Sequence, residues 1–382
     1  MIDIVAEHEL RQLAEASDEH CISIYLPTHR IGREAAADRI RFKNAVAGAR
    51  RDLLALGLRS PVADALLGGA DALTHDERLW SHLDAGLAVF ASATLHRAHR
   101  LPGPVPELVV VSDRFHIKPL VPLTASDETF HVLALSQSDV RVFRGTRYEL
   151  TELELGSIPH DLATALRFDD RESQLQSHGA QRTGTGRVAR RFHGHGVGVD
   201  TKDADLGRFL AAVDDGLAEL VGDRPAPLVL AGVDSTVARF RALSSHPRIV
   251  RGEIEGSAAA LTAAELHARS WPLVQEVFLT PRRRALAAVE DRVAQVVETL
   301  AVAVVAALDG RVSSVFVPAG VQRWGRIDAE RRRVEEHADR IPGDRDLLDA
   351  VAVETLTHGG EVFVVEPSEM PLGAGVVALL RY

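Results

Sequence analysis

The order of apolar and polar residues predicts a chain that mixes strands and helices from its first hundred residues onward. The apolar, β-rich run at residues 20–28 ends near a proline and predicts a buried strand. Apolar residues spaced for a helix, from Ile40 to Leu56, predict a long amphipathic helix that ends near Gly57. Arginines and Lys43 occupy its other positions, so we expect a basic outer face. With further strands predicted at 86–91, 107–111 and 115–118, residues 1–126 are expected to form an α+β domain.

A second pattern begins near Thr129 and predicts a central domain over residues 127–256. Alternating runs at 130–136 and 140–145 flank a short polar connection, which is typical of an antiparallel hairpin, and a third strand is expected at 150–155. Farther along, the segments alternate between strand and helix, which indicates a parallel pair with a right-handed crossover. The predicted segments are a helix at 204–220, a strand at 227–231, a helix at 235–244 and a short strand near 249.

The last third, residues 257–382, predicts a compact α/β domain. Thr262 and Glu265 form a capping box at the start of one helix, which we expect to end at Pro272. Apolar residues at helical spacing from 286 to 308 predict a second, longer helix that stops at Gly310. A further helix at 347–356 and strands at 312–317, 361–365 and 376–380 complete a three-domain prediction.

Composition narrows the class of protein. The chain has 382 residues, of which 46% are hydrophobic and 26% charged, as expected of a globular protein with more than one domain. Its net charge of −10 argues against a surface that coats nucleic acid throughout, so any basic function is local. Cys21 is the only cysteine, which excludes an intramolecular disulfide. The amino-terminal residues do not resemble a signal peptide, and the longest uncharged run, 299–308, is too short to cross a bilayer. We therefore expect a cytoplasmic protein without a membrane span.

One long segment of the central domain differs from everything around it. Residues 171–199 hold six glycines, five arginines and three histidines, with one acidic side chain and almost no apolar periodicity. Loops longer than about 12–15 residues are uncommon in compact domains and are usually either functional or unstructured. Glycine allows close approach of the backbone to a partner, and arginine offers forked donors to phosphate. Two interpretations remain open, a solvated insertion and an arm that reaches a phosphate-rich partner.

The histidines of this loop raise the question of a metal. His178, His193 and His195 have no carboxylate or cysteine at ligand spacing, so the metal pattern is weak and we expect no metal ion. A hydrolase that uses these histidines remains a third, minor hypothesis. No phosphate-binding loop, dinucleotide fingerprint or nucleophile elbow occurs at a strand-to-helix junction, so we expect no cofactor.

Two further basic clusters lie in the last third. Arg282, Arg283 and Arg284 are expected at the start of a helix, where positive charge costs a few tenths of a kcal/mol to about 1 kcal/mol. A local rule broken without visible gain can mark a binding site, so these three are candidate RNA contacts. Residues 331–333 are also arginines, but nearby glutamates predict an ordinary salt-bridged surface helix.

Several of these segments resemble one superfamily. The ending HGGEVFVVEPSEMPLGAGVVALLRY is similar to the carboxyl-terminal end of Pelota-like proteins and archaeo-eukaryotic class I peptide chain release factors. The segments HVLALSQSDVRVFRG and PLVLAGVD resemble their central ribonuclease-H-like domain. With ISIYLPTHR near the start, the chain most resembles the bacterial relatives of that superfamily. The resemblance implies a ribonuclease-H-like middle domain and a carboxyl-terminal α/β domain of RNA-binding type.

The resemblance also implies a function for the loop. In the release factors, a basic loop of the central domain carries Gly-Gly-Gln into the peptidyl-transferase centre and promotes hydrolysis of the peptidyl-tRNA ester. Gly179, Ala180 and Gln181 are the counterpart here. A backbone amide at Gln181 could stabilise the developing oxyanion without any titrating group. The resemblance assigns contacts with tRNA and ribosomal RNA to the basic side chains around it, namely Arg182, Arg187, Arg190, Arg191, His193 and His195.

Ala180 departs from the pattern of the release factors. If that position needs a positive φ, alanine costs roughly 1–2 kcal/mol. Two hypotheses therefore stay open: a release or ribosome-rescue factor that hydrolyses peptidyl-tRNA, and a non-catalytic Pelota-like stress factor that binds ribosomes. The first domain shows no stop-codon-reading motif, so codon-specific termination is not expected. Expected partners are the ribosome, tRNA and a translational GTPase, and the sequence does not predict the oligomeric state.

Overall fold

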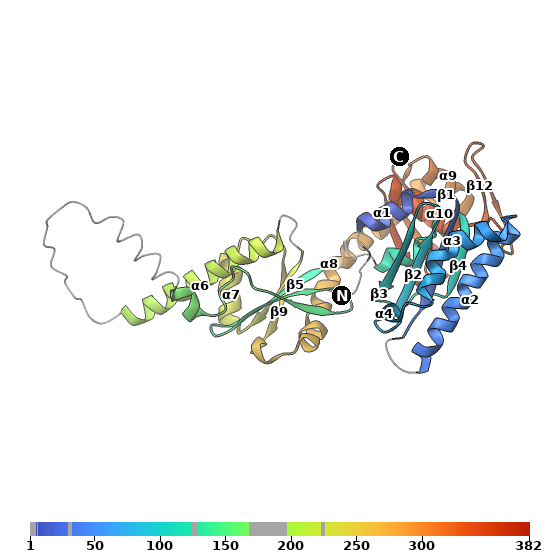
Figure 1. Ribbon diagram of the computed structural model, residues 1–382. Coiled ribbons are helices and arrows are strands. Elements are labelled where there is room, and N and C mark those ends of the chain that lie inside the picture. Colours follow the sequence, from blue (N-terminus) through green and yellow to red (C-terminus); the bar gives the residue numbers. More distant parts are fainter. Residues whose placement is uncertain (1–4, 6, 30–32, 124–128, 168–196, 223–225) are drawn as a thin grey trace, which may run out of the picture. The chain divides into compact units, whose positions relative to one another are not determined.

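The protein divides into two compact units. The computed structural model describes residues 5, 7–29, 33–123, 129–167, 197–222 and 226–382 (Figure 1). One unit combines the first and last thirds of the chain, residues 1–127 and 280–382, and the other is the middle, residues 128–279. The expected domain boundaries near 127 and 256 stay a prediction. The division into three domains is a finer one and stays a prediction.

An antiparallel sheet organises the first third of the chain. Its strand order is β3-β2-β1-β4, and the strands span Ser17–Pro27 (β1), Gly86–Ala91 (β2), His96–Leu101 (β3) and Leu108–Arg114 (β4). The helices span Glu7–Glu15 (α1), Arg33–Ala55 (α2), Ser60–Leu73 (α3) and Glu77–Trp80 (α4). The apolar faces of α2 and α3 share one core with the sheet. The strand expected at 115–118 is wrong, because β4 ends at Arg114 and a 3₁₀ helix, η1, spans Lys118–Leu123.

The last third contains two sheets. The larger has the order β10-β16-β11-β15, with β11 parallel to β15 and antiparallel to β16. The strands span Val296–Val297 (β10), Val312–Pro318 (β11), Glu361–Val365 (β15) and Val377–Leu380 (β16), and the helices Leu300–Leu308 (α9) and Leu347–Thr357 (α10) pack in the same core. The smaller sheet has the order β13-β12-β14, with strands at Trp324–Asp328 (β12), Arg333–Glu336 (β13) and Arg345–Asp346 (β14).

Arg331 and Arg332 lie in the turn between β12 and β13, and Arg333 is the first residue of β13, so the triplet is not in a helix. β12 and β13 are antiparallel neighbours, and Arg332 has a φ of 52° at their connection. Arg331 pairs with Asp328 at 3.2 Å and Arg332 with Asp309 at 2.8 Å. The expected helix is therefore wrong, and these two arginines pair with Asp328 and Asp309 in place of the glutamates expected from the sequence.

Helix α8, Ala263–Asp291, is longer than predicted. It continues through Pro272 and Pro281, although a proline inside a helix removes a hydrogen bond. Burial explains its persistence, since Leu266 and Val274 lie in one core and Ala285 and Val289 lie in another. The long helix expected at 286–308 does not form. A 3₁₀ turn (η3, Val293–Gln295) and strand β10 separate the end of α8 from α9.

The middle unit is a five-stranded mixed sheet between helices. Its order is β7-β6-β5-β8-β9, with strands at Phe130–Leu135 (β5), Val140–Gly145 (β6), Leu150–Leu153 (β7), Leu228–Gly232 (β8) and Ile249–Glu255 (β9). β5, β6 and β7 are antiparallel, and β5, β8 and β9 are parallel, which confirms the expected hairpin and the expected parallel pair. Helices Val197–Val221 (α6) and Asp234–Leu243 (α7) share a core with one face, and α8 shares a core with the other. None of the described helices is long and apolar enough to cross a membrane.

Candidate functional site

The predicted catalytic and RNA-binding residues of the loop lie outside the described residues. They are Gly179, Ala180, Gln181, Arg182, Arg187, Arg190, Arg191, His193 and His195, and the same is true of His178. The structure does describe where this segment is attached. The chain leaves the described part at Arg167 and returns at Val197, where α6 begins. The loop expected at 171–199 therefore ends earlier than predicted, because residues 197–199 are helical.

The segment that leads into the loop, residues 155–167, is fixed to the hairpin of the middle unit. The amide of Val140 donates to the carbonyl of His160 at 2.9 Å, and the amide of Leu162 donates to the carbonyl of Gln137 at 2.9 Å. The Asp161 carboxylate accepts a hydrogen bond from the Thr164 amide at 2.6 Å, and this bond lowers the pKa of Asp161. Asp161 thus satisfies an amide at the start of the helical residues 162–167.

Helix α6, which follows the loop, packs on this lead-in segment. Phe209, Val213 and Leu217 of α6 are buried in the core that also contains Ile158. A Cβ at Gly216 would lie 2.7 Å from Ile158 Cγ1 and 3.0 Å from the Ile158 amide nitrogen. Glycine is therefore required for this close approach. Both attachments of the predicted loop belong to one core on one face of the sheet. Sequence reasoning missed Gly216, although a lone glycine inside a helical pattern is a known sign of close packing.

Asp203, near the start of α6, is bound by Arg239 of α7. Arg239 Nη2 lies 2.9 Å from Asp203 Oδ2 and also donates to the carbonyl oxygen of Asp203 at 2.7 Å. The guanidinium of Arg239 lowers the pKa of Asp203. Asp205 pairs with Arg208 within α6. These acids near the return point therefore have local partners and do not need the arginines of the loop to neutralise them.

A shallow cavity of about 550 Å³ lies between α6 and α7. Asp214, Arg239 and Ser245 contribute polar groups to its wall. Asp214 binds the chain that follows α7. It accepts hydrogen bonds from the Ser245 amide at 2.8 Å and the Ser245 hydroxyl at 2.9 Å. Arg239 is committed to Asp203. The polar groups of this cavity serve the packing of the two helices, and they do not form a catalytic arrangement.

The remaining predicted RNA contacts, Arg282, Arg283 and Arg284, lie in the interior of α8 in the other unit. They do not lie at the start of a helix, so the predicted unfavourable charge at a helix start is wrong. Arg282 is largely covered and pairs with Glu369 at 3.1 Å. Arg283 and Arg284 are exposed. Exposure leaves Arg283 and Arg284 accessible to a phosphate.

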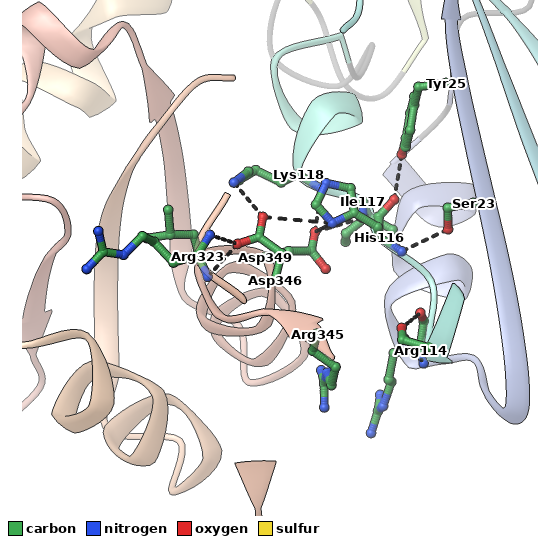
Figure 2. A network of polar contacts seen from close by, with 12 residues as sticks. Ser23, Tyr25, Arg114, His116, Ile117, Lys118, Arg323, Arg345, Asp346 and Asp349 are labelled. Atoms are coloured by element: carbon green, nitrogen blue, oxygen red, sulfur yellow. Dashed lines mark hydrogen bonds and ion pairs between the residues drawn. The ribbon is translucent and has the colours of Figure 1, made fainter. Parts of the chain in front are cut away.

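The same unit contains a buried network of charges that the sequence did not indicate (Figure 2). The Lys118 side chain is 2% exposed and that of Asp346 is 0% exposed, and Lys118 Nζ lies 2.7 Å from Asp346 Oδ2. Lys118 also donates to the carbonyl of Val321. Asp349 Oδ1 accepts the amides of Ile117 at 2.8 Å and Lys118 at 2.7 Å. The chain after β4 is therefore bound to the amino-terminal end of α10.

His116 lies in the centre of this network, and Figure 2 shows its ring beside the two carboxylates. Its Nδ1 is 3.6 Å from Asp349 Oδ1 and 3.9 Å from Asp346 Oδ2. Within the described part of the chain, neither ring nitrogen has a hydrogen-bond partner. Burial lowers the pKa of His116, and the two carboxylates oppose that shift. The backbone of His116 is held from the other side, because Tyr25 donates to its carbonyl at 2.6 Å and its amide donates to Ser23 Oγ at 3.0 Å.

This network is closed to substrates, so its geometry favours a structural role over a catalytic one. His116, Lys118, Asp346 and Tyr25 are all buried. Asp346 also caps α10 by accepting the Leu348 amide at 3.1 Å. Among the residues that the structure describes, no group of three or more histidine, cysteine or carboxylate side chains could hold a metal ion. The histidines of the predicted loop lie outside these residues.

Comparison with known proteins identifies the class of the middle of the chain. Residues 129–311 match the family model of bacterial archaeo-eukaryotic release factor family 3. The match covers slightly less than half of the chain and confirms, over these residues, the resemblance that the sequence predicted. A search of curated proteins found no match.

Three solved structures illustrate the structural similarity. The Pelota of Archaeoglobus fulgidus is 11% identical, with 98% of this chain and 92% of that chain covered and a TM-score of 0.32. The archaeal translation termination factor aRF1 is 13% identical, with 99% of each chain covered and a TM-score of 0.24. An archaeal Pelota described as bound to the ribosome together with ABCE1 is 10% identical, with 100% and 95% covered and a TM-score of 0.37.

Proposed function

We propose that this protein is a cytoplasmic, translation-associated factor of the release-factor and Pelota type, which binds the ribosome and tRNA. The observation that carries the proposal is the match of residues 129–311 to a release-factor family, since these residues include the basic segment with Gln181. The order of the middle sheet supports a ribonuclease-H-like domain as the base of that segment, because an antiparallel meander continues into two parallel strands. A translational GTPase remains an expected partner.

The proposed site is the segment Gly179-Ala180-Gln181 with the arginines that follow it. The lead-in segment 155–167 and helix α6 share one core, where Ile158 contacts α6 at Gly216. A segment held at both ends can present its middle to a partner while the sheet stays folded. The backbone amide of Gln181 would stabilise the oxyanion of the ester hydrolysis, its side chain would orient solvent, and the arginines would bind RNA phosphates.

Peptide release from stalled ribosome–nascent-chain complexes tests the catalytic part. We expect the wild-type protein to release the nascent chain and Gln181→Ala to reduce the rate at least tenfold, since it removes the side chain that orients solvent. Ala180→Gly restores the second glycine and is expected to raise the rate, because it relieves the cost of a positive φ. An equal rate of release from wild type and Gln181→Ala would remove Gln181 from the mechanism.

Co-sedimentation with ribosomes tests the binding part. Replacing Arg187, Arg190 and Arg191 by glutamate is expected to weaken binding at least tenfold and to reduce its dependence on salt, because each arginine–phosphate contact releases counterions. The matched control places three glutamates at exposed basic positions of the same unit, Lys202, Arg248 and Arg251. Equal losses in both variants would contradict a specific role for the loop.

The alternative function is a non-catalytic factor that occupies stalled ribosomes. Ala180 favours it, because the second glycine of the release-factor pattern is missing. Ribosome binding that depends on the loop arginines, combined with no peptide release by wild type or by Ala180→Gly, would establish this alternative.

A further inference from the structure

Helix α2 exposes apolar side chains on the face that points away from its own core. Ile40 is 64% exposed and Leu54 is 42% exposed, and the exposed Ala47 lies midway between them. The three residues are seven positions apart, so they follow one line along the helix over about 21 Å. A spacing of seven residues is typical of helices that pack lengthwise against another helix, and α2 is long enough to contain all three positions.

The core of the protein does not account for this stripe. The opposite face of α2 carries Phe42, Val46, Ala49 and Leu53, which are buried against the sheet and α3. Figure 1 shows α2 and α3 together beside the strands of the first sheet. α2 therefore has two apolar faces, and only one of them is used in folding.

Charge distinguishes the kind of partner that the second face fits. Most arginines of α2 with described side chains are bound to carboxylates of the same unit: Arg39 with Glu77 at 2.9 Å, Arg41 with Glu107 at 2.9 Å and Arg50 with Asp64 at 2.6 Å. The basic outer face expected from the sequence is therefore largely neutralised. Such a face is poorly suited to an RNA backbone, which needs cations in excess.

Two basic side chains remain beside the stripe. Lys43 and Arg51 are exposed, and the described residues supply no ion-pair partner for either. Both lie within about 60° of the line through Ile40 and Leu54, at the helical period of 3.6 residues per turn. An acidic side chain on each edge of a partner's apolar stripe would meet them.

We propose that this face, formed by Ile40, Lys43, Ala47, Arg51 and Leu54, is a docking surface for an acidic amphipathic helix of another protein. The apolar residues supply the contact area, and Ala47 permits close approach at its centre. A second copy of this chain fits less well. The same face of a second copy carries two basic side chains and no acidic one, so Lys43 and Arg51 would find no ion-pair partner on it. The proposal is independent of the proposed function.

Binding of a synthetic helical peptide to the full chain tests this surface. The peptide has three heptads, with leucine at every seventh position and glutamates on both edges of the leucine stripe. We expect micromolar binding, weakened at least tenfold by Ile40→Asp with Leu54→Asp, and weakened at least tenfold by Lys43→Glu with Arg51→Glu. Ala47→Gln, which adds bulk at the centre and preserves helix propensity, is expected to weaken binding as well. The matched control, Val293→Asp, changes a more exposed apolar residue of the same unit and is expected to leave binding unchanged.

Four results would overturn the proposal. They are no binding of the acidic peptide by the wild type, equal binding of a peptide with lysine in place of each glutamate, a dimer in sedimentation that Ile40→Asp dissociates, and binding of an RNA oligonucleotide that depends on Lys43 and Arg51 but not on Ile40. Circular dichroism melts confirm that each variant is folded, which the exposure of the changed side chains predicts.

Discussion

At the scale of single residues, His131 shows how the middle unit depends on pH. It lies on β5 directly opposite Arg144 of β6 and is 9% exposed. Its ring Nδ1 has no hydrogen-bond partner among the described residues. Burial, together with the positive charges of Arg144 and His246, lowers the pKa of His131 to about 4. The pKa of His246 is also lowered by burial and by Arg248, although Asp214 opposes that shift.

Acid is therefore expected to destabilise the middle unit. In the unfolded chain His131 binds a proton below its ordinary pKa of 6.5, whereas in the folded protein it stays neutral down to about pH 4. The free energy of unfolding thus falls as the pH decreases from 6.5 to 4, by about 3 kcal/mol at most. His131→Phe should remove most of this loss. Urea unfolding at pH 7.5 and pH 4.5 measures it, with His160→Phe, an exposed histidine of the same unit, as the control. Equal loss in the wild type and His131→Phe would assign the acid sensitivity to other groups.

Candidate site residues can be predicted from the sequence where residue type and spacing suggest their chemistry. Residues whose environment depends on how two strands pair were missed. Gly179, Ala180 and Gln181 were proposed from a short pattern, and that proposal stays a prediction. The sequence did not single out His131, because a polar residue beside Val132 and Leu133 is ordinary in a strand. Only the pairing of β5 with β6 places it opposite Arg144.

At the scale of elements, Gly216 controls how α6 packs on the segment that leads into the loop. Gly216→Ala is expected to lower the free energy of unfolding by about 1–3 kcal/mol, because the added Cβ would overlap Ile158, including its backbone. Helix propensity alone predicts the opposite, a gain of up to about 1 kcal/mol. Gly207→Ala in the same helix is the matched control. Its Cβ would meet only Arg239 Nη2, at 3.5 Å, so this change should stabilise.

Urea unfolding of both glycine variants measures the difference, and amide hydrogen exchange of residues 155–166 shows whether the lead-in segment opens more often. Stabilisation by Gly216→Ala comparable to that by Gly207→Ala would show that the contact with Ile158 does not constrain α6.

Helices and strands could be predicted where the spacing of apolar residues alone determines them. The hairpin β5–β6, the parallel strands β8 and β9 and helix α2 follow directly from their apolar spacing. Local signals failed where tertiary packing opposed them. Pro272 predicted the end of the helix that begins after Thr262, yet burial on both sides of this proline keeps α8 continuous. The arginines at 331–333 suit a helix, but antiparallel pairing of β12 with β13 decides their conformation.

At the scale of the whole molecule, the joining of the first and last thirds into one unit could not be predicted from the sequence. No periodicity links Lys118 to Asp346, which are more than two hundred positions apart along the chain. Other contacts repeat the link, since Arg340 donates to the carbonyl of Val109 at 2.8 Å and pairs with Asp52 at 3.1 Å. Arg340 also lies over the ring of Trp324, at 4.8 Å from its centroid. Contacts between such distant segments form only after both segments have folded, so the sequence pattern does not indicate them.

The stability of this unit is expected to depend on the buried ion pair of Lys118 and Asp346. Lys118→Met leaves the Asp346 carboxylate buried without its cation, and breaking a buried pair in this way costs about 3–5 kcal/mol. The exposed pair of Arg331 with Asp328 is the control, and Arg331→Met should change the free energy of unfolding by less than about 1 kcal/mol.

Tryptophan fluorescence reports whether both thirds respond together to that change. Trp80 lies in the first third and Trp324 in the last, while Trp271 of the middle unit is removed as Trp271→Phe. Variants that retain only Trp80 or only Trp324 should unfold at the same urea concentration, because the buried network joins their segments into one cooperative unit. Lys118→Met should lower both midpoints equally. A shift of the Trp324 midpoint alone would mean that the two thirds unfold independently and that the network is not what couples them.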